Sequence, residues 1–201
     1  MRLRDACSIQ IGYTARSRFE PTTDGGVLTI QLRDFSVGGD INPDRLTRVR
    51  LDERVDRYLV AAGDVLFRSR GDRNTATALD ARFVEPAVAV LPLMVLRPTR
   101  AIILPEYLAW TINQPDAQRH FDLAARGTNL RMVPKASLDD LRLDVPDLET
   151  QKRIAVVAAL AEREETLMRL LATAKKDLTN RLLAERAKRT WRATKPKRPR
   201  A

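Results

Sequence analysis

The chain has 201 residues, enough for one large or two small domains with a core that needs neither disulfides nor metals. It carries 36 Lys and Arg against 26 Asp and Glu, a formal net charge of +10 that attracts polyanions. Its single cysteine excludes an internal disulfide, and no apolar stretch approaches the roughly 18 residues that span a bilayer. The first 16 residues lack the apolar run of a signal peptide, so we expect a reducing, cytoplasmic compartment.

Short apolar or alternating runs broken by glycine and proline predict an irregular β core up to about residue 105. The predicted strands are residues 26–32, 58–67 and 87–98, with glycine turns at 25–26, 38–39 and 63–64. Residues 105–125 have a helical pattern that Pro115 interrupts, which predicts one or two short helices. Residues 141–148 alternate apolar and polar and predict a last strand that returns to the sheet.

From Thr150 the composition changes to about 40 residues without Gly or Pro, rich in strong helix formers. One helix of about 60 Å is expected at 1.5 Å per residue, longer than a domain of this size needs. Its apolar residues recur in steps of three and four over three heptads, with Glu164 the one charged residue among them. The stripe predicts pairing with another helix; the alternative is an amphipathic helix packed wholly on its own domain. The predicted dimerisation residues are Val157, Leu160, Leu167, Leu171, Ala174 and Leu178.

The predicted organisation is a globular domain over 1–149, a long helix over 150–189 and a tail over 190–201. The tail contains Lys, Arg and two prolines without an acidic residue, which predicts a disordered cationic segment. The alternative is a terminus that only improves solubility.

The sequence argues against catalysis. It has one histidine, His120, no CxxC pair and no carboxylates clustered at ligand spacing, so neither a metal site nor a Ser-His-Asp arrangement is expected. A Gly-rich phosphate loop is also missing from the sequence. We therefore predict that the chain itself binds no cofactor or metal and is not an enzyme.

Two polar clusters lie where loops are expected. The first occupies residues 68–74, between the strand-like runs VLF and TATAL, and the second lies in residues 125–135. Arginine can pair bidentately with phosphate or with guanine O6 and N7, and asparagine with adenine N6 and N7, so both clusters suit DNA recognition. The alternative is that these residues form local ion pairs across turns. The candidate DNA contacts are Arg16, Arg18, Arg68, Arg70, Arg73, Asn74, Arg126, Thr128, Asn129, Arg131 and Lys135, with Arg16, Arg18 and Lys135 assigned to phosphates.

Three segments in order also resemble a known family. RYLVAAGDVLFRSRG, ARGTNLRMVPKASLDDLRLDVPDLETQKRIA and the following helix are similar to one target-recognition domain and its conserved helix in specificity (S) subunits of type I restriction-modification systems. The family's GD-plus-apolar pair matches residues 63–67, its G-T segment matches Gly127 and Thr128, and its helix entry matches Pro146, Gln151 and Ile154. The chain departs from the family at Asp147 and Thr150, where a second proline and a glutamate are usual.

The resemblance implies an α/β (α+β) recognition domain with an irregular, mostly β core and short helices, followed by one long coiled-coil helix. A typical S subunit has two recognition domains separated by two antiparallel helices, whereas this chain has one of each. It is therefore expected to be a non-catalytic half-subunit that reads double-stranded DNA and pairs with itself or another half. By resemblance, its partners are a methyltransferase subunit, which would bind S-adenosylmethionine, and a translocating endonuclease subunit. Two other readings remain open: an RNA-binding module and a non-enzymatic coiled-coil adaptor.

Overall fold

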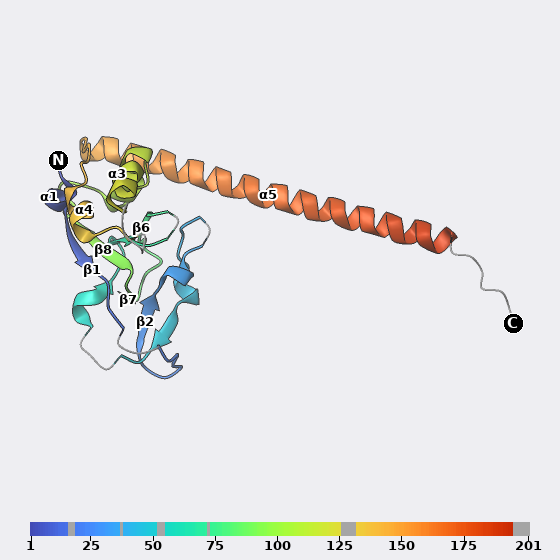
Figure 1. The fold of residues 1–201 in the computed structure, drawn as a ribbon, viewed down its shortest axis with the longest axis horizontal. Helices are drawn as coiled ribbons and strands as arrows, with labels where there is room; N and C mark the ends of the chain where they lie inside the picture. Colours follow the sequence, from blue (N-terminus) through green and yellow to red (C-terminus); the bar gives the residue numbers. More distant parts are fainter. Residues whose placement is uncertain (16–18, 37, 52–54, 72, 126–131, 195–201) are drawn as a thin grey trace. The chain divides into compact units, whose positions relative to one another are not determined.

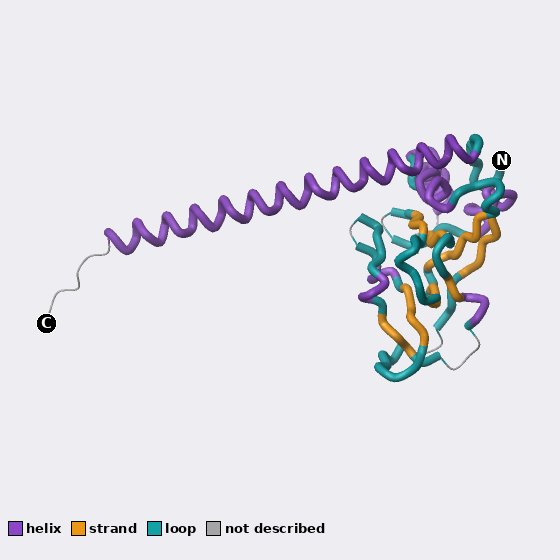
Figure 2. The backbone as a smooth tube through the Cα atoms, turned by 180° about the vertical axis from the view of Figure 1, so that it is seen from behind, coloured by secondary structure: helices purple, strands orange, loops and turns teal. Residues whose placement is uncertain are grey.

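The computed structural model describes residues 1–15, 19–36, 38–51, 55–71, 73–125 and 132–194. The chain divides into two units, Met1–Val157 and Ala158–Ala201. The first unit contains two four-stranded sheets, and the second continues the long helix (Figures 1 and 2).

The two sheets differ in strand direction. The first sheet is antiparallel throughout, in the order β1 (Cys7–Ile11), β8 (Leu93–Pro98), β5 (Val65–Arg68) and β6 (Ala76–Ala78). The second has the order β3 (Thr47–Val49), β2 (Val27–Ile30), β7 (Ala87–Ala89) and β4 (Leu59–Val60), with β2 and β7 parallel. The mixed helix and strand composition predicted from the sequence is confirmed.

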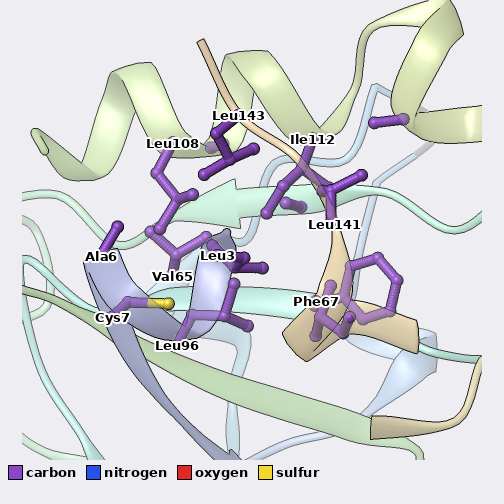
Figure 3. Close-up of a cluster of buried hydrophobic side chains, with 14 of the residues drawn as sticks. Leu3, Ala6, Cys7, Val65, Phe67, Leu96, Leu108, Ile112, Leu141 and Leu143 are labelled. Atoms are coloured by element: carbon purple, nitrogen blue, oxygen red, sulfur yellow. The ribbon is translucent and has the colours of Figure 1, made fainter. Parts of the chain in front are cut away.

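The central strands of the first sheet are buried on both faces. Because side chains alternate along a strand, Val65 and Phe67 of β5 enter a core shared with the helices, while Leu66 enters a core shared with the second sheet. Figure 3 shows Leu108 of helix α2 (Pro105–Ile112) pointing toward Val65 in the first of these cores. The ring of Phe67 also lies 5.0 Å, centroid to centroid, from that of Phe121. This packing explains why the sequence of β5 is continuously apolar.

Short helices flank the sheets. They are α1 (Leu3–Ala6), α2 (Pro105–Ile112), α3 (Pro115–Ala125) and α4 (Lys135–Asp140), with 3₁₀ turns η1 (Leu32–Asp34), η2 (Pro43–Arg45) and η3 (Asp56–Tyr58). Pro105 and Pro115 each occupy the first position of a helix, where the missing N–H costs nothing. The prediction of one or two short helices after residue 105 is therefore confirmed, and there are two, whereas α1, α4 and the 3₁₀ turns were not predicted.

Two of the predicted strands are each divided between the sheets. Residues 58–67 form β4 and β5, separated by a turn in which Gly63 has φ +96°, and residues 87–98 form β7 and β8. A continuous apolar run conceals such a division, because strands in either sheet are buried.

The predicted last strand at 141–148 is wrong. Leu141 and Leu143 are buried in the core, as the alternation suggested, but Arg142 makes only an isolated bridge, with Arg2. The backbone of this segment pairs with the start of the chain, through Leu3 N to Leu141 O at 2.8 Å and Leu143 N to Met1 O at 2.9 Å. Because α1 begins at Leu3, there is no extended partner along which a ladder could continue.

The long helix α5 (Leu148–Thr194) extends beyond the predicted range at both ends. Asp147 caps its first turn: its carboxylate accepts hydrogen bonds from the backbone nitrogen of Thr150 at 2.9 Å and from the Thr150 hydroxyl at 2.7 Å. Its last residues, 190–194, lie in the segment predicted to be a disordered tail, and 195–201 lie outside the described residues. None of the described helices combines the length and apolar character that a bilayer span requires.

Candidate nucleic-acid interface

The first polar cluster forms the loop between β5 and β6, and backbone contacts fix both of its ends. Arg68 N donates to Thr75 O at 2.8 Å, which closes the loop across its base. Ser69 is fully buried and donates to Pro92 O twice, from its backbone nitrogen at 3.1 Å and from its hydroxyl at 2.6 Å. The loop therefore starts from a rigid point on the first sheet.

The second polar cluster ends against this loop. Arg70 and Met132 form an isolated antiparallel bridge, and Val133 N donates to Ser69 O at 2.8 Å. The fold thus joins two segments that lie about 60 residues apart in the sequence. Arg126, Thr128, Asn129 and Arg131, which precede Met132, lie outside the described residues, as do Arg16 and Arg18.

The loop presents Arg70 and Arg73 to solvent. In the described part of the chain neither arginine takes part in an ion pair, unlike several other cations of the domain. Arg82 is held between Asp40 and Asp80, which raises its pKa through hydrogen bonds to both carboxylates. Arg48 is paired with Glu85. Among the described residues, therefore, no carboxylate occupies the donors of Arg70 or Arg73.

Arg68 has a different environment from the other two arginines. Its guanidinium lies over the ring of Phe35, 5.3 Å from the centroid, and its Nε is buried without a hydrogen-bond partner among the described residues. Phe35 belongs to a third loop, which is fixed to β6 by the hydrogen bond from the Thr77 hydroxyl to Gly39 O at 2.8 Å. This third loop was not predicted, because it offers a single aromatic residue rather than a basic cluster.

Asn74 connects the end of the loop to its start and to α3. Its side-chain nitrogen donates to Arg68 O at 3.0 Å, and its backbone oxygen accepts from Gln118 Nε2 at 2.9 Å. Nearby, Asn113 pairs twice with the backbone of Ala76, through Ala76 N to Asn113 Oδ1 at 2.8 Å and Asn113 Nδ2 to Ala76 O at 2.9 Å. Asn113 and Gln118 were missed from the sequence, where isolated amides on predicted helices give no distinctive signal.

Lys135 is engaged within its own helix. Its ammonium group contacts both carboxylate oxygens of Asp139, at 2.9 and 2.7 Å, one turn further along α4. A phosphate would have to compete with the Asp139 carboxylate, so Lys135 is less available to DNA than Arg70 or Arg73.

Two groups with catalytic potential elsewhere in the domain are bonded or buried. His120 Nε2 lies 2.8 Å from the carbonyl oxygen of Ser137. Cys7 is buried, and burial, with a further contribution from nearby Asp139, raises the pKa of its thiol to about 12. Within the described residues there is no group of three or more side chains suited to hold a metal ion.

The predicted dimerisation residues all lie exposed on α5. Val157 and Leu160 have exposed fractions of 66% and 64%, and Leu167, Leu171 and Leu178 have 52%, 55% and 58%. Val156 and Leu182, which the heptad pattern omitted, are exposed to the same degree, at 52% and 58%. The helix therefore has an apolar surface larger than the one predicted.

Comparison with known proteins supports the fold assignment. No family model and no curated protein sequence matches the chain. Among solved structures, a chain from a study of complex assembly and conformational transition of the type I R-M system is 20% identical, with a TM-score of 0.67; the match covers 99% of this chain and 50% of that one.

Two further structures give the same result. The HsdS subunit from Thermoanaerobacter tengcongensis is 18% identical with a TM-score of 0.56, over 82% of this chain and 37% of the subunit. The type I restriction-modification S subunit from M. genitalium is 13% identical with a TM-score of 0.55, over 97% of this chain and 46% of the subunit. The chain shares the fold of these proteins and spans half of their length or less.

Proposed function

We propose that this chain, which has the fold of a type I S subunit, reads the sequence of double-stranded DNA and is itself non-catalytic. The observation that supports this proposal most directly is the bridge between Arg70 and Met132, which places the segment that starts at Met132 against the surface of the first loop. Arg70 and Arg73 are exposed on that surface, and a guanidinium can pair bidentately with guanine O6 and N7.

The rigid support of the loop suits base recognition. Ser69 fixes its start to Pro92, and Asn74 fixes its end to Arg68, so the exposed arginines belong to a loop that is held at both ends. A preorganised loop loses less conformational entropy on binding than a free one. The net charge of +10 adds a general attraction to phosphate that does not depend on sequence.

The length of the chain suggests that it acts as half of a recognition unit. It spans at most half of the S subunits that it resembles, and α5 exposes leucines along most of its length. We therefore propose that α5 pairs with a second copy or with another half-subunit. The paired helices would position a methyltransferase subunit, which would bind S-adenosylmethionine, and an endonuclease subunit.

Competition binding tests this function. The purified full chain is mixed with labelled duplex DNA containing its methylation motif, mapped in the native cell, and is competed with random duplex or single-stranded RNA at fixed salt. We expect the cognate duplex to bind at least 100-fold more tightly than random duplex, and duplex more tightly than RNA. Preference for RNA would indicate an RNA-binding module, and lack of binding to either would indicate a protein-binding adaptor; both results would overturn the proposal.

A further inference from the structure

The last residue of β5 is an arginine on an apolar face. Side chains alternate along a strand, so Arg68 lies on the same face as Leu66, which is buried in the core shared with the second sheet. Phe35 is packed against the same core. The guanidinium carbon of Arg68 lies 5.3 Å from the centroid of the Phe35 ring. A cation therefore lies where the pattern of β5 would place another apolar side chain.

The Phe35 ring is held in place by its own loop, whose described residues are 35, 36 and 38–41. Phe35 forms an isolated antiparallel bridge with Ile41, which is 1% exposed. The carbonyl oxygen of Gly39 accepts a hydrogen bond from the Thr77 hydroxyl of β6 at 2.8 Å. The 35–41 loop is thus attached both to the core and to the strand that follows the loop between β5 and β6.

The guanidinium of Arg68 also approaches the turn within the loop between β5 and β6. Gly71 in this turn has φ +132°, a conformation that strains any residue with a Cβ atom. A Cβ atom on Gly71 would lie 3.7 Å from Nη2 of Arg68 and 4.0 Å from the carbonyl oxygen of Arg73. The Arg68 side chain thus lies beside the backbone turn that separates the two exposed arginines, Arg70 and Arg73.

Stability does not explain an arginine at this position. The Nε of Arg68 is buried without a hydrogen-bond partner among the described residues, and an unpaired buried donor costs free energy. A leucine or methionine would fill a similar space without this cost. What the guanidinium adds is a rigid plane that stacks on an aromatic ring and so takes one orientation. Unfavourable local choices of this kind are typical of functional sites.

A second arginine of the described residues stacks on a ring in a different setting. The guanidinium carbon of Arg57 lies 4.6 Å from the centroid of the Tyr58 ring, in the turn η3. Arg57 and Tyr58 are neighbours in the sequence, so their contact joins no separate segments. The contact of Arg68 with Phe35, in contrast, joins the end of a strand of the first sheet to the loop that follows β2 and η1.

We propose that Arg68 is a positioning residue for DNA recognition. Its stack on Phe35 fixes the turn at Gly71 relative to the 35–41 loop, and thereby sets the positions from which Arg70 and Arg73 reach base edges. Phe35 thus governs discrimination between DNA sequences without touching DNA. The inference rests on the proposed function, because it takes the loop between β5 and β6 to read duplex DNA, and it adds the 35–41 loop as a second determinant of specificity.

Substitutions at Phe35 separate stacking from packing. Phe35→Leu keeps an apolar side chain against the core and removes the ring face, whereas Phe35→Tyr keeps that face. We expect Phe35→Leu to lower the ratio of cognate to random duplex affinity about tenfold, with affinity for random duplex changed less than about twofold. Phe35→Tyr should retain the wild-type ratio. Competition binding of the full chain at fixed salt measures each ratio, and urea denaturation verifies that each variant is folded.

Arginine variants complete the comparison. Arg68→Lys keeps the charge but not the plane, so it should lower the ratio as Phe35→Leu does, and it tests the same stack without changing the core. Arg57→Ala is the matched control, since it removes an arginine stacked on a ring elsewhere in the domain, and it should leave the ratio unchanged. In a chain with Arg70→Ala and Arg73→Ala, Phe35→Leu should cause no further loss of discrimination, because the side chains that it positions are gone.

The outcomes separate this inference from the proposed function. If the wild-type chain discriminates between duplexes and Phe35→Leu does so equally, or if the losses from Phe35→Leu and from the two arginine substitutions are additive, positioning through Arg68 is overturned and DNA reading stands. If Arg68→Ala lowers affinity for all duplexes alike and reduces the salt slope by about one, Arg68 contacts phosphate and positions nothing. A wild-type chain without preference for its cognate duplex would overturn the proposed function and this inference with it.

Discussion

The side-chain oxygen of Gln151 accepts a hydrogen bond from the backbone nitrogen of Leu104 at 2.9 Å. The nitrogen of the same side chain donates to Ile102 O at 2.9 Å and to Pro146 O at 2.8 Å. Gln151 is fully buried, so one amide joins the first turns of α5 to the segment before α2 and the segment before α5 itself. The Gln151 side chain thus provides a polar attachment of α5 to the rest of the first unit.

Replacing Gln151 should therefore destabilise the domain strongly. Gln151→Ala leaves a backbone N–H and two carbonyl groups without this partner in a buried site, and we expect a loss of about 3 kcal/mol in the free energy of unfolding. Urea denaturation measures the loss. Lys152→Ala, at the exposed neighbouring position, is the matched control and should change stability by less than about 0.5 kcal/mol. Equal effects of the two substitutions would contradict this role of the amide.

The cap at the start of α5 should make that helix end sensitive to acid. Hydrogen bonds from the side chain and backbone of Thr150 lower the pKa of the Asp147 carboxyl group. A lowered folded-state pKa means that the stabilisation is present above the ordinary value of about 3.9 and is lost as the pH falls through the folded value.

Asp147→Asn tests this dependence. We expect the difference in unfolding free energy between wild type and Asp147→Asn to be constant above about pH 5 and to diminish below the ordinary carboxyl pKa of about 3.9. Denaturation at pH 6 and pH 3 measures it. A difference that grows toward acid pH would be inconsistent with a lowered pKa.

Arg70 should contribute to sequence discrimination. Arg70→Ala is expected to cost about 1–3 kcal/mol on the cognate duplex and to relax the preference at one base position. Lys135→Ala is the comparison, because Lys135 is already paired with Asp139 and should affect all duplexes alike and weakly. Competition titrations at fixed salt measure both. Equal losses on cognate and random DNA for Arg70→Ala would assign Arg70 to phosphate rather than to a base.

Asn74 should act through the shape of its loop. Because its side chain donates to Arg68 O, Asn74→Ala should open the loop and reduce the protection of residues 69–75 in hydrogen exchange. The matched variant Asn113→Ala removes the neighbouring contacts with Ala76 and should loosen β6 in the same way. If Asn74→Ala leaves exchange unchanged and alters preference at a single base, the adenine-reading role predicted from the sequence is the correct one.

The sequence predicted the parts of this fold that depend on local pattern. The long helix followed from its composition, and Pro105 and Pro115 marked two helix starts, because fixed φ and a missing N–H are properties of the residue itself. The division of residues 87–98 between two sheets was not predicted, since β7 and β8 are both apolar and only their tertiary partners distinguish them. The same limit explains the error at 141–148, where buried leucines alternate but the backbone has no ladder to join.

The residue types of the candidate site were predicted from the sequence, but the tertiary contacts of these residues were not. Residues 68–74 were identified as a loop from the sequence, whereas the bridge between Arg70 and Met132 could not be predicted, because it depends on long-range pairing. Residue type alone also failed to separate Arg68, stacked on Phe35, from Arg70, which is exposed. For the described residues, the structure thus divides one basic cluster into supporting and accessible members.

The double-sided burial of β5 limits where this protein can vary. Insertion of one residue between Val65 and Leu66 would exchange the faces of Leu66 and Phe67 and disrupt two cores at once. Beyond Ser69, the exposed positions of the loop contact neither core. New specificities should therefore be obtainable by exchanging the loop between Ser69 and Asn74 as a cassette, with both anchoring residues retained, whereas changes of length within the strand should produce insoluble chains.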